Sequence, residues 1–418
     1  MVVAARHYTP KRVVITGLGI VSSLGSTMES VWHSLTESCS GIGPITKFDA
    51  GRFATRIGGE VTADFDAGKH LTPREINVLG IATQYAIHAG YEAFADAGLC
   101  EQDYRPENGV VFWGTAYGAL DLISDGHCRF FNNGRLSPYF IPGIMQNAPA
   151  FELAKRLRLE GSNLTVSTAC SSSAVAIGHA FQAIRNGVAD IALSGGSEAP
   201  LTPLNVQAWC ELRAMSVRND TPAASVRPFS ADRDGMVLGE GAGAVILESL
   251  DTAQARGARI YAELAGFGAC CDTTHVTLPD PRAQAAAMRN ALEDSGMDIE
   301  EIHFINAHGT GTRANDKAES EAVRSVFGRR AYDVPVHSSK PFFGHLIGAS
   351  GAVELIAALL CARHGVLHPT LNYSQRDPEC DLDYVTEGPR RTQAVNFLSN
   401  SFAFGGNNAV LAVREFMA

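Results

Sequence analysis

The sequence predicts an α/β fold in which strands and helices alternate in layers, built from two similar halves. Short apolar runs bounded by Gly, Ser or Asp alternate with longer segments of helical periodicity, which is typical of layered α/β proteins. Strand–turn–helix units recur with similar endings, Arg-Asn-Gly-Val at 185–188 and Arg-His-Gly-Val at 363–366. The 418 residues, 45% of them hydrophobic and 19% charged, suffice for one large α/β unit or two ordinary domains.

The expected strands are short runs rich in Val, Ile, Leu and Phe, each closed by a turn-forming residue. In chain order they span residues 12–16, 110–113, 163–167, 191–193, 242–247, 261–267, 303–307, 334–337, 396–399 and 409–413. The expected helices are longer segments in which apolar residues recur every three or four positions. They span residues 73–97, 174–186, 282–294, 317–326 and 352–364.

The evidence for two halves is a repeated order of elements. The strand at 163–167 runs into small residues and then a helix, and the strand at 334–337 runs into a Gly-rich turn and then a helix. This pattern predicts one half in residues 1–255 and a second in residues 256–418. The alternative, that any α/β protein repeats such units, stays open at this point.

Charge and cysteine content exclude several classes of protein. The formal net charge is −10, and non-specific nucleic-acid binding depends on Lys and Arg that neutralise phosphates, so we expect no nucleic-acid partner. The nine cysteines are odd in number and include no CxxC pair, which favours reduced thiols without a disulfide framework or a zinc site. We expect no metal and no bound cofactor. Gly17 and Gly19 follow a strand, but Ser22 replaces the third glycine of a dinucleotide fingerprint, so they indicate a tight turn.

The sequence also predicts a cytoplasmic protein without a membrane partner. The longest apolar run, near 353–362, is interrupted by Glu354 and falls short of the ~20 residues that span a bilayer. Residues 1–5 are apolar, but Arg6 and His7 follow at once, so we expect no signal-peptide core.

Cys170 is the first candidate for chemistry. It lies in Thr-Ala-Cys-Ser-Ser-Ser, where a β-prone run ends in small residues and a helix follows. We therefore expect a sharp strand-to-helix turn that places the thiol near a helix N-terminus, where the dipole and free N–H groups lower a thiol pKa. The alternative is an inert buried cysteine, which is the usual fate of this residue.

Three further loops carry candidate groups. His308 opens a Gly/Thr loop after a strand, with the Thr310 and Thr312 hydroxyls beside it. His345 precedes a helix rich in small residues, where an imidazole is biased toward its neutral form and can donate to an oxyanion, and Lys340 supplies nearby positive charge. The segment 400–408 pairs two glycines with Phe402 and Phe404, which suggests a turn that presents N–H groups beside an aromatic gate. Each is weak alone, since ordinary loops have the same composition.

Together these loops supply one thiol and two histidines at strand ends, without an acidic partner in any motif. A thiol protease uses one histidine, often oriented by Asn or Asp. Two neutral histidines instead suit a reaction that builds charge on a thioester carbonyl oxygen. Loss of CO₂ from a malonyl thioester forms such an enolate.

At this point the chain resembles the β-ketoacyl-acyl-carrier-protein synthases, the elongating condensing enzymes of the thiolase superfamily, of the synthase II kind. The matching motifs are TACSSS around Cys170, HGTGT at 308–312, Lys340 with GHLIGASG at 344–351, and NSFAFGG at 400–406. The resemblance covers nearly the whole chain. It implies a thiolase-like duplicated fold of five αβαβα layers, usually dimeric.

The resemblance also implies a role for each motif. Cys170 would take an acyl chain from an acyl carrier protein, and the N–H groups of Cys170 and Phe404 would form the oxyanion hole. His308 and His345 would hold the malonyl thioester carbonyl and stabilise the enolate after decarboxylation. Attack of this enolate on the Cys170 thioester gives a β-ketoacyl product two carbons longer. Lys340 would support the site electrostatically.

Other positions concern the substrate and the carrier. Thr310 and Thr312 would contact the phosphopantetheine arm, and Phe402 would line the substrate site. Tyr117 stands where the family often has a smaller residue in the acyl tunnel, so it would shorten or polarise the pocket. Arg213 would form part of a local basic patch for the acidic carrier.

Two alternatives remain open at this point. A degradative thiolase needs a second cysteine on the late C-terminal loop, and the segment 401–408 has none. A chain-length-factor-like subunit would bind a catalytic partner but lack the nucleophile, which Cys170 argues against. Primary fatty-acid synthesis, type II polyketide or polyene synthesis, a homodimer, and a heterodimer with a related ketosynthase-like subunit all fit the sequence.

Overall fold

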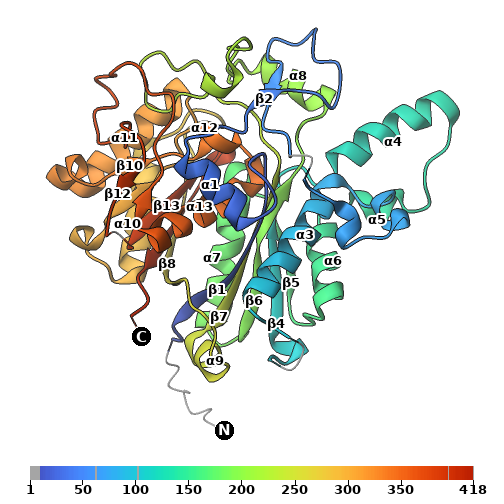
Figure 1. The fold of residues 1–418 in the computed structure, drawn as a ribbon, viewed down its shortest axis with the longest axis horizontal. Helices are drawn as coiled ribbons and strands as arrows, with labels where there is room; N and C mark the ends of the chain where they lie inside the picture. The colour runs from blue at the N-terminus through green and yellow to red at the C-terminus, as the bar shows by residue number, and fades with distance from the viewer. Residues whose placement is uncertain (1–9, 62–63, 101–102, 394, 418) are drawn as a thin grey trace.

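Ten strands form one mixed sheet in the computed structural model of the chain, which describes residues 10–61, 64–100, 103–393 and 395–417 (Figure 1). The strands of this sheet are β1 Val13–Val21, β4 Gly109–Gly114, β5 Asn163–Val166, β6 Ile191–Glu198, β7 Gly241–Ser249, β8 Ala262–Cys271, β9 Phe304–Asn306, β10 Val336–His337, β13 Phe397–Phe402 and β14 Asn407–Arg414. Two small sheets pair β2 (Gly43–Pro44) with β3 (Ile57–Gly58), and β11 (Val366–Leu367) with β12 (Arg390–Arg391). The expectation drawn from residues 1–7 lies outside the described residues.

The two halves of the large sheet repeat one topology. From edge to centre the first half runs β5-β4-β6-β7-β1, and the second runs β10-β9-β13-β14-β8. In each half the first strand along the chain lies at the centre of the sheet, and the third lies at its edge. Counted from the edge inward, the first two neighbouring strand pairs are parallel and the next two are antiparallel. Antiparallel pairing of β1 with β8 joins the halves. The predicted α/β duplication is confirmed.

The helices complete the layers around the sheet. Helices α7 (Ser172–Arg185) and α13 (Ser350–His364) pack on each other between the two halves, as the centre of Figure 1 shows. Helices α3 (Ile81–Asp96) and α6 (Ala148–Leu157) cover the other face of the first half, and α10 (Pro281–Ser295) with α11 (Arg313–Phe327) covers that of the second. This is the five-layer αβαβα order.

Shorter helices form the loops and edges. The remaining α-helices are α1 Met28–Thr36, α2 Pro73–Ile76, α4 Leu120–Asn133, α5 Phe140–Ile144, α8 Pro203–Glu211, α9 Leu250–Ala255 and α12 Lys340–Phe343. The 3₁₀ helices are η1 Ala67–Lys69, η2 Pro106–Asn108, η3 Ala169–Ser171, η4 Pro222–Ala224, η5 Ile299–Glu301, η6 Gly328–Tyr332, η7 Ile347–Ala349 and η8 Phe404–Gly406.

Two predicted elements differ from the structure at glycines that pack closely against a neighbouring segment. The expected helix 73–97 is two helices, α2 and α3, and a Cβ at Gly80 between them would lie 2.5 Å from that of Ala119. The expected turn at Gly17 and Gly19 is instead part of β1. A Cβ at Gly19 would lie 1.9 Å from the carbonyl oxygen of Ala89 in α3, so glycine permits the helix to pack directly on the strand.

The apolar segment Ile347–His364 is longer than the sequence indicated. It is the one helical segment among the described residues long and apolar enough to cross a membrane, and 83% of its 18-residue window is buried inside the protein. This segment contains α13, which is the central core helix between the halves.

Candidate active site

A cavity of about 600 Å³ opens where loops from both halves meet. It is lined by seven of the nine residues that the sequence assigns to the site: Cys170, His308, Thr310, Thr312, His345, Phe402 and Phe404. Lys340 and Tyr117, the other two, lie behind this wall. The structure therefore brings residues far apart in the sequence to one space.

The turn that presents Cys170 is as sharp as the sequence predicts. Strand β5 ends at Val166, η3 follows, and α7 begins at Ser172, whose hydroxyl accepts a hydrogen bond from the N–H of Thr168 at 2.9 Å. Ala169 has a φ of 51°, a left-handed conformation that costs energy for a residue with a Cβ. Cys170 is 5% exposed and lies at the cavity wall.

Three hydrogen-bonding groups converge on the Cys170 sulfur. The Nε2 atom of His345 lies 3.0 Å away, and the backbone N–H groups of Cys170 and Phe404 also face the sulfur. The last two are the donors that the sequence analysis expected for an oxyanion hole. Burial nevertheless raises the pKa of the Cys170 thiol to about 11, while Lys340 and the N–H groups oppose this rise. The expectation of a lowered thiol pKa is wrong, because desolvation outweighs the helix N-terminus.

The environment of His345 fixes its tautomer. The backbone N–H of Ile347 donates to Nδ1 at 3.3 Å, and the Ser350 hydroxyl lies 2.8 Å from the same nitrogen. Burial and the charge of Lys340 hold the pKa of His345 well below its usual value, so the ring is neutral. Since Nδ1 accepts, we assign the proton to Nε2, where it points at the sulfur.

His308 is held in the same state by a cation. Its Nδ1 lies 3.2 Å from the Lys340 ammonium, which can only donate, so the ring proton belongs on Nε2. Burial, with the Lys340 charge, holds the pKa of His308 well below its usual value. The rings of His308 and His345 lie 5.4 Å apart at 81°, so both can reach one substrate oxygen.

Lys340 acts on this pair from behind the cavity wall. Its ammonium donates to the His308 carbonyl and lies 2.6 Å from the Glu354 carboxylate, and both side chains are buried. Burial raises the pKa of Glu354 to about 7, although Lys340 opposes the rise. The ion pair thus places a fixed positive charge beside His308.

Glu319, in α11, is a positioning residue that the sequence analysis missed. Its carboxylate accepts the backbone N–H groups of His308 and Gly309, each at 2.8 Å, and the Asn400 amide at 3.1 Å. It thereby ties the histidine loop to β13. A signal existed, since Asn315, Asp316 and Glu319 form a polar stripe at helical spacing in a helix that must face the core.

Glu319→Ala is expected to lower the free energy of unfolding by about 3 kcal/mol, because it leaves buried N–H groups without acceptors. The rate of malonyl decarboxylation should also fall, since the His308 backbone loses the carboxylate that holds it. Chemical denaturation and CO₂ release measure the two effects. Glu321→Ala, on the exposed side of the same helix, is the control and should change neither. Equal effects of the two substitutions would contradict the anchoring role.

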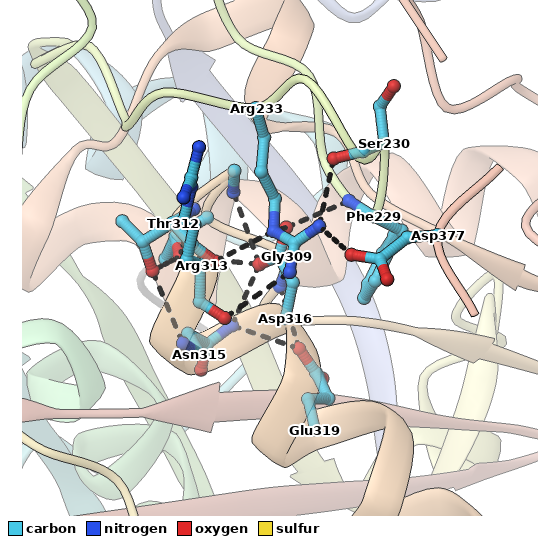
Figure 2. A network of polar contacts seen from close by, with 12 residues as sticks. Phe229, Ser230, Arg233, Gly309, Thr312, Arg313, Asn315, Asp316, Glu319 and Asp377 are labelled. Atoms are coloured by element: carbon cyan, nitrogen blue, oxygen red, sulfur yellow. Dashed lines mark hydrogen bonds and ion pairs between the residues drawn. The ribbon is translucent and has the colours of Figure 1, made fainter. Parts of the chain in front are cut away.

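A second network fixes the far end of the same loop (Figure 2). Asp316 accepts the N–H groups of Phe229 at 2.8 Å and Gly311 at 3.2 Å. Arg233 donates to the Thr312 carbonyl at 3.2 Å and to Asp377 at 2.5 Å. These buried contacts hold the Thr310 and Thr312 side chains at the cavity wall.

The aromatic side of the cavity places Tyr117 differently from the sequence expectation. The ring of Phe404 stacks on Trp209, with centroids 5.7 Å apart, and the Trp209 Nε1–H donates to the Tyr117 hydroxyl at 3.0 Å. Trp209, which the sequence analysis did not single out, lines the cavity in place of Tyr117. The Tyr117 backbone N–H donates to Glu198, which also accepts from Gly348 near His345.

The same donors could also hold a metal ion. The donor atoms of Cys170, His308 and His345 lie within 4.8 Å of one another, a spacing that a transition metal can bridge. The absence of a metal remains a prediction from the sequence.

The chain is similar to known proteins along nearly its whole length. Residues 10–253 match the family model for the β-ketoacyl synthase N-terminal domain, and residues 261–374 match that for the C-terminal domain. The 3-oxoacyl-[acyl-carrier-protein] synthase 2 of Synechocystis sp. is 42% identical over 97% of this chain and 98% of the relative. The 3-oxoacyl-[acyl-carrier-protein] synthase 2 of Coxiella burnetii is 40% identical over 96% of this chain and 98% of the relative.

Solved structures show the same likeness. The ishigamide ketosynthase/chain length factor has a TM-score of 0.92 and 37% identity, covering 98% of this chain and all of that one. A type II polyketide ketosynthase, solved in complex with its acyl carrier protein, has a TM-score of 0.90 and 33% identity over 98% of this chain and 100% of that one. Because the two family models and these relatives cover nearly all of the described fold, the chain belongs to the β-ketoacyl synthase family.

Proposed function

We propose that this chain catalyses decarboxylative Claisen condensation of malonyl-acyl carrier protein with an acyl chain held on Cys170. The product is a β-ketoacyl carrier two carbons longer, in fatty-acid or polyketide synthesis. The observation that carries the proposal is the convergence of one thiol and two neutral Nε2–H donors on a single cavity. The nucleophile comes from the half formed by residues 1–255, and both histidines from the half formed by residues 256–418.

The first step is acyl transfer to sulfur. The Cys170 sulfur attacks the thioester carbonyl of the acyl carrier, the carrier's carbon–sulfur bond breaks, and the proton lost by Cys170 ends on the carrier thiol. The N–H groups of Cys170 and Phe404, which face the sulfur, would stabilise the oxyanion of the tetrahedral intermediate. A thioester replaces a thioester, so no oxidant or energy source is needed.

The second step makes and uses a carbon nucleophile. The malonyl thioester oxygen would accept hydrogen bonds from the Nε2–H groups of His308 and His345. Loss of CO₂ moves the electron pair into an enolate on that oxygen. Neutral donors hold this charge without giving up a proton. The enolate carbon attacks the Cys170 thioester, and the carbon–sulfur bond breaks. Cys170 leaves as a thiolate, which takes up one proton from solvent to return to the thiol.

Acyl loading is expected to accelerate between about pH 7 and pH 9, because the pKa of Cys170 is about 11 and the thiolate fraction grows about tenfold per pH unit below it. Decarboxylation should stay flat over this range, since both histidines are already neutral. Single-turnover acyl transfer and CO₂ release, each followed against pH, measure the two half-reactions. A loading rate that is constant from pH 7 upward would contradict the protonated thiol.

Tyr117 sets the depth of the acyl pocket through Trp209. Tyr117→Gly is expected to shift the products toward longer or bulkier chains, because the indole loses the ring and hydroxyl that hold it. Tyr117→Phe removes only the hydroxyl and should leave chain length nearly unchanged. Mass spectrometry of products from a panel of acyl carriers measures the shift, and an unchanged profile for Tyr117→Gly would contradict this role.

The partners that the proposal requires are an acyl carrier protein and a second ketosynthase-like subunit. Arg213 is exposed at the rim of the cavity. It offers positive charge to an acidic carrier, although this chain itself has a net charge of −10.

The second partner would cover apolar surface. Strand β5 is an edge strand with Leu164 exposed. Large apolar side chains are exposed on and around α4 and α5: Ile123, Phe130, Phe131, Leu136, Tyr139, Ile141 and Met145. Such a patch favours a dimer, and native mass spectrometry distinguishes a homodimer from a heterodimer. We expect this dimer to act in the cytoplasm.

The test of the function is reconstitution with purified carriers. The protein is mixed with a panel of acyl-loaded carriers and malonyl carrier, and the carrier-bound products are measured by mass. We expect β-ketoacyl carriers two carbons longer than the starter. Release of CO₂ without any elongated product, across the whole panel, would contradict condensation.

A further inference from the structure

A second cluster of metal-ligating side chains lies in the core, outside the cavity. His337 ends β10, Cys361 lies in α13, and His368 follows β11. All three side chains are fully buried. Their ligand atoms lie within 4.8 Å of one another, and the rings of His337 and His368 are 4.1 Å apart. Three elements distant in the sequence therefore bring two imidazoles and one thiol to a single point.

Three of the four histidine ring nitrogens in this cluster make no hydrogen bond among the described residues. Neither ring nitrogen of His337 meets the geometry of a hydrogen bond, although the His368 backbone lies near the ring, and Nε2 of His368 has no partner among the described residues. The Nδ1–H of His368 donates to the Pro369 carbonyl at 3.0 Å, which leaves a lone pair on Nε2. A backbone carbonyl that fixes the tautomer in this way is the usual outer partner of a metal-ligating histidine.

The surroundings of the cluster are apolar. The Phe304 ring lies edge-on to His337 at 5.2 Å, and the Phe342 ring lies edge-on to His368 at the same distance. Cys361 belongs to the largest hydrophobic core cluster. Neutral imidazoles are the ligand form, and a metal ion would displace the thiol proton to solvent.

We propose that His337, Cys361 and His368 form a closed three-coordinate site for one thiophilic metal ion, Cu⁺ in preference to Zn²⁺. A thiolate and two imidazoles are ligands that suit both ions. The charge of the complex decides between them. Cu⁺ with one thiolate is neutral, whereas Zn²⁺ with one thiolate leaves a net positive charge in an apolar core, which is costly without a counterion. In a trigonal site with bonds of about 2.0 Å to nitrogen and about 2.3 Å to sulfur, the ligand atoms lie about 3.5 to 3.7 Å apart, so small side-chain shifts complete the site.

The test must exclude the active-site cysteine, since Cys170 with its two histidines offers a similar donor set. The full chain carrying Cys170→Ala is expressed in medium supplemented with copper or zinc, because the buried site is filled as the chain folds. The protein is purified without oxygen and treated with an excess of a Cu⁺ chelator, which removes copper bound to exposed thiols. Metal content per chain is then measured.

We expect about one retained copper per chain, with an X-ray absorption spectrum of one sulfur and two nitrogen ligands. Cys361→Ala in the same background should lose the metal, while the control Cys380→Ala, another fully buried cysteine, should keep it. If the Cys361→Ala protein folds poorly, His337→Phe gives a second test of the same loss. No retained metal, retention that does not depend on Cys361, or zinc retained in place of copper would each overturn the proposal.

Discussion

Cys170→Ala is expected to abolish acyl loading and to lower condensation by roughly 10⁴-fold or more, as loss of a nucleophile does in enzymes with covalent intermediates. The sulfur is the atom on which His345 and two backbone N–H groups converge, and no other thiol lines the cavity within the described residues. Intact-protein mass after incubation with acyl carrier measures loading, and product mass measures condensation.

The same variant should keep its capacity to decarboxylate malonyl carrier. The alanine removes only the sulfur, while the Nε2–H groups of His308 and His345 still face the cavity. Cys380→Ala is the matched control, since it removes a buried thiol that does not line the cavity and should load acyl chains normally. Acyl loading that survives Cys170→Ala would show that another group is the nucleophile.

His308→Ala and His345→Ala are each expected to slow malonyl decarboxylation by about 10²–10³-fold, the usual cost of removing one oxyanion donor. Acyl loading should change far less, because the Cys170 and Phe404 N–H groups remain for that step. Stopped-flow CO₂ release and single-turnover loading separate the two effects. The double variant should lose less than the product of the single losses, since both rings serve one oxygen.

His275 provides the control for this experiment. It also lines the cavity but is exposed, and its Nδ1 accepts the N–H of Thr277 at 3.1 Å. His275→Ala should therefore leave decarboxylation nearly unchanged. If the His308 and His345 variants decarboxylate as fast as the His275 variant, the enolate is stabilised elsewhere and the assigned roles are wrong.

Much of the architecture follows from local sequence signals. Apolar runs mark the strands, and the repeated Arg-x-Gly-Val ending of α7 and α13 marks two helices that prove to be equivalent elements of the duplicated halves. Contacts between distant segments are not encoded locally. Gly19 reads as a turn residue because its reason, the close approach of α3 to β1, involves a helix about 70 residues away along the chain.

In the site, too, some residues show in the local sequence and others depend on contacts between distant segments. Motifs around Cys170, His308 and His345 are visible because each joins a reactive side chain to small residues at a strand end. Glu198 carries no such local signal, and Glu319 shows only as one member of a polar stripe on its helix. Their roles need the structure, because their partners are backbone N–H groups of other segments. The sign of the Cys170 pKa shift also needs the structure, since it is the balance of burial against converging donors.

The central claim is that Cys170 holds the acyl chain that a decarboxylated malonyl unit attacks. Its most direct test is a single-turnover chase, in which acyl-loaded protein is isolated, mapped by peptide mass, and mixed with malonyl carrier labelled with ¹³C at the methylene carbon. The account predicts acyl mass on the Cys170 peptide, which then disappears into a carrier-bound product two carbons longer that retains the label. Acyl mass on another residue, or acyl-Cys170 that persists while CO₂ is released, would contradict it.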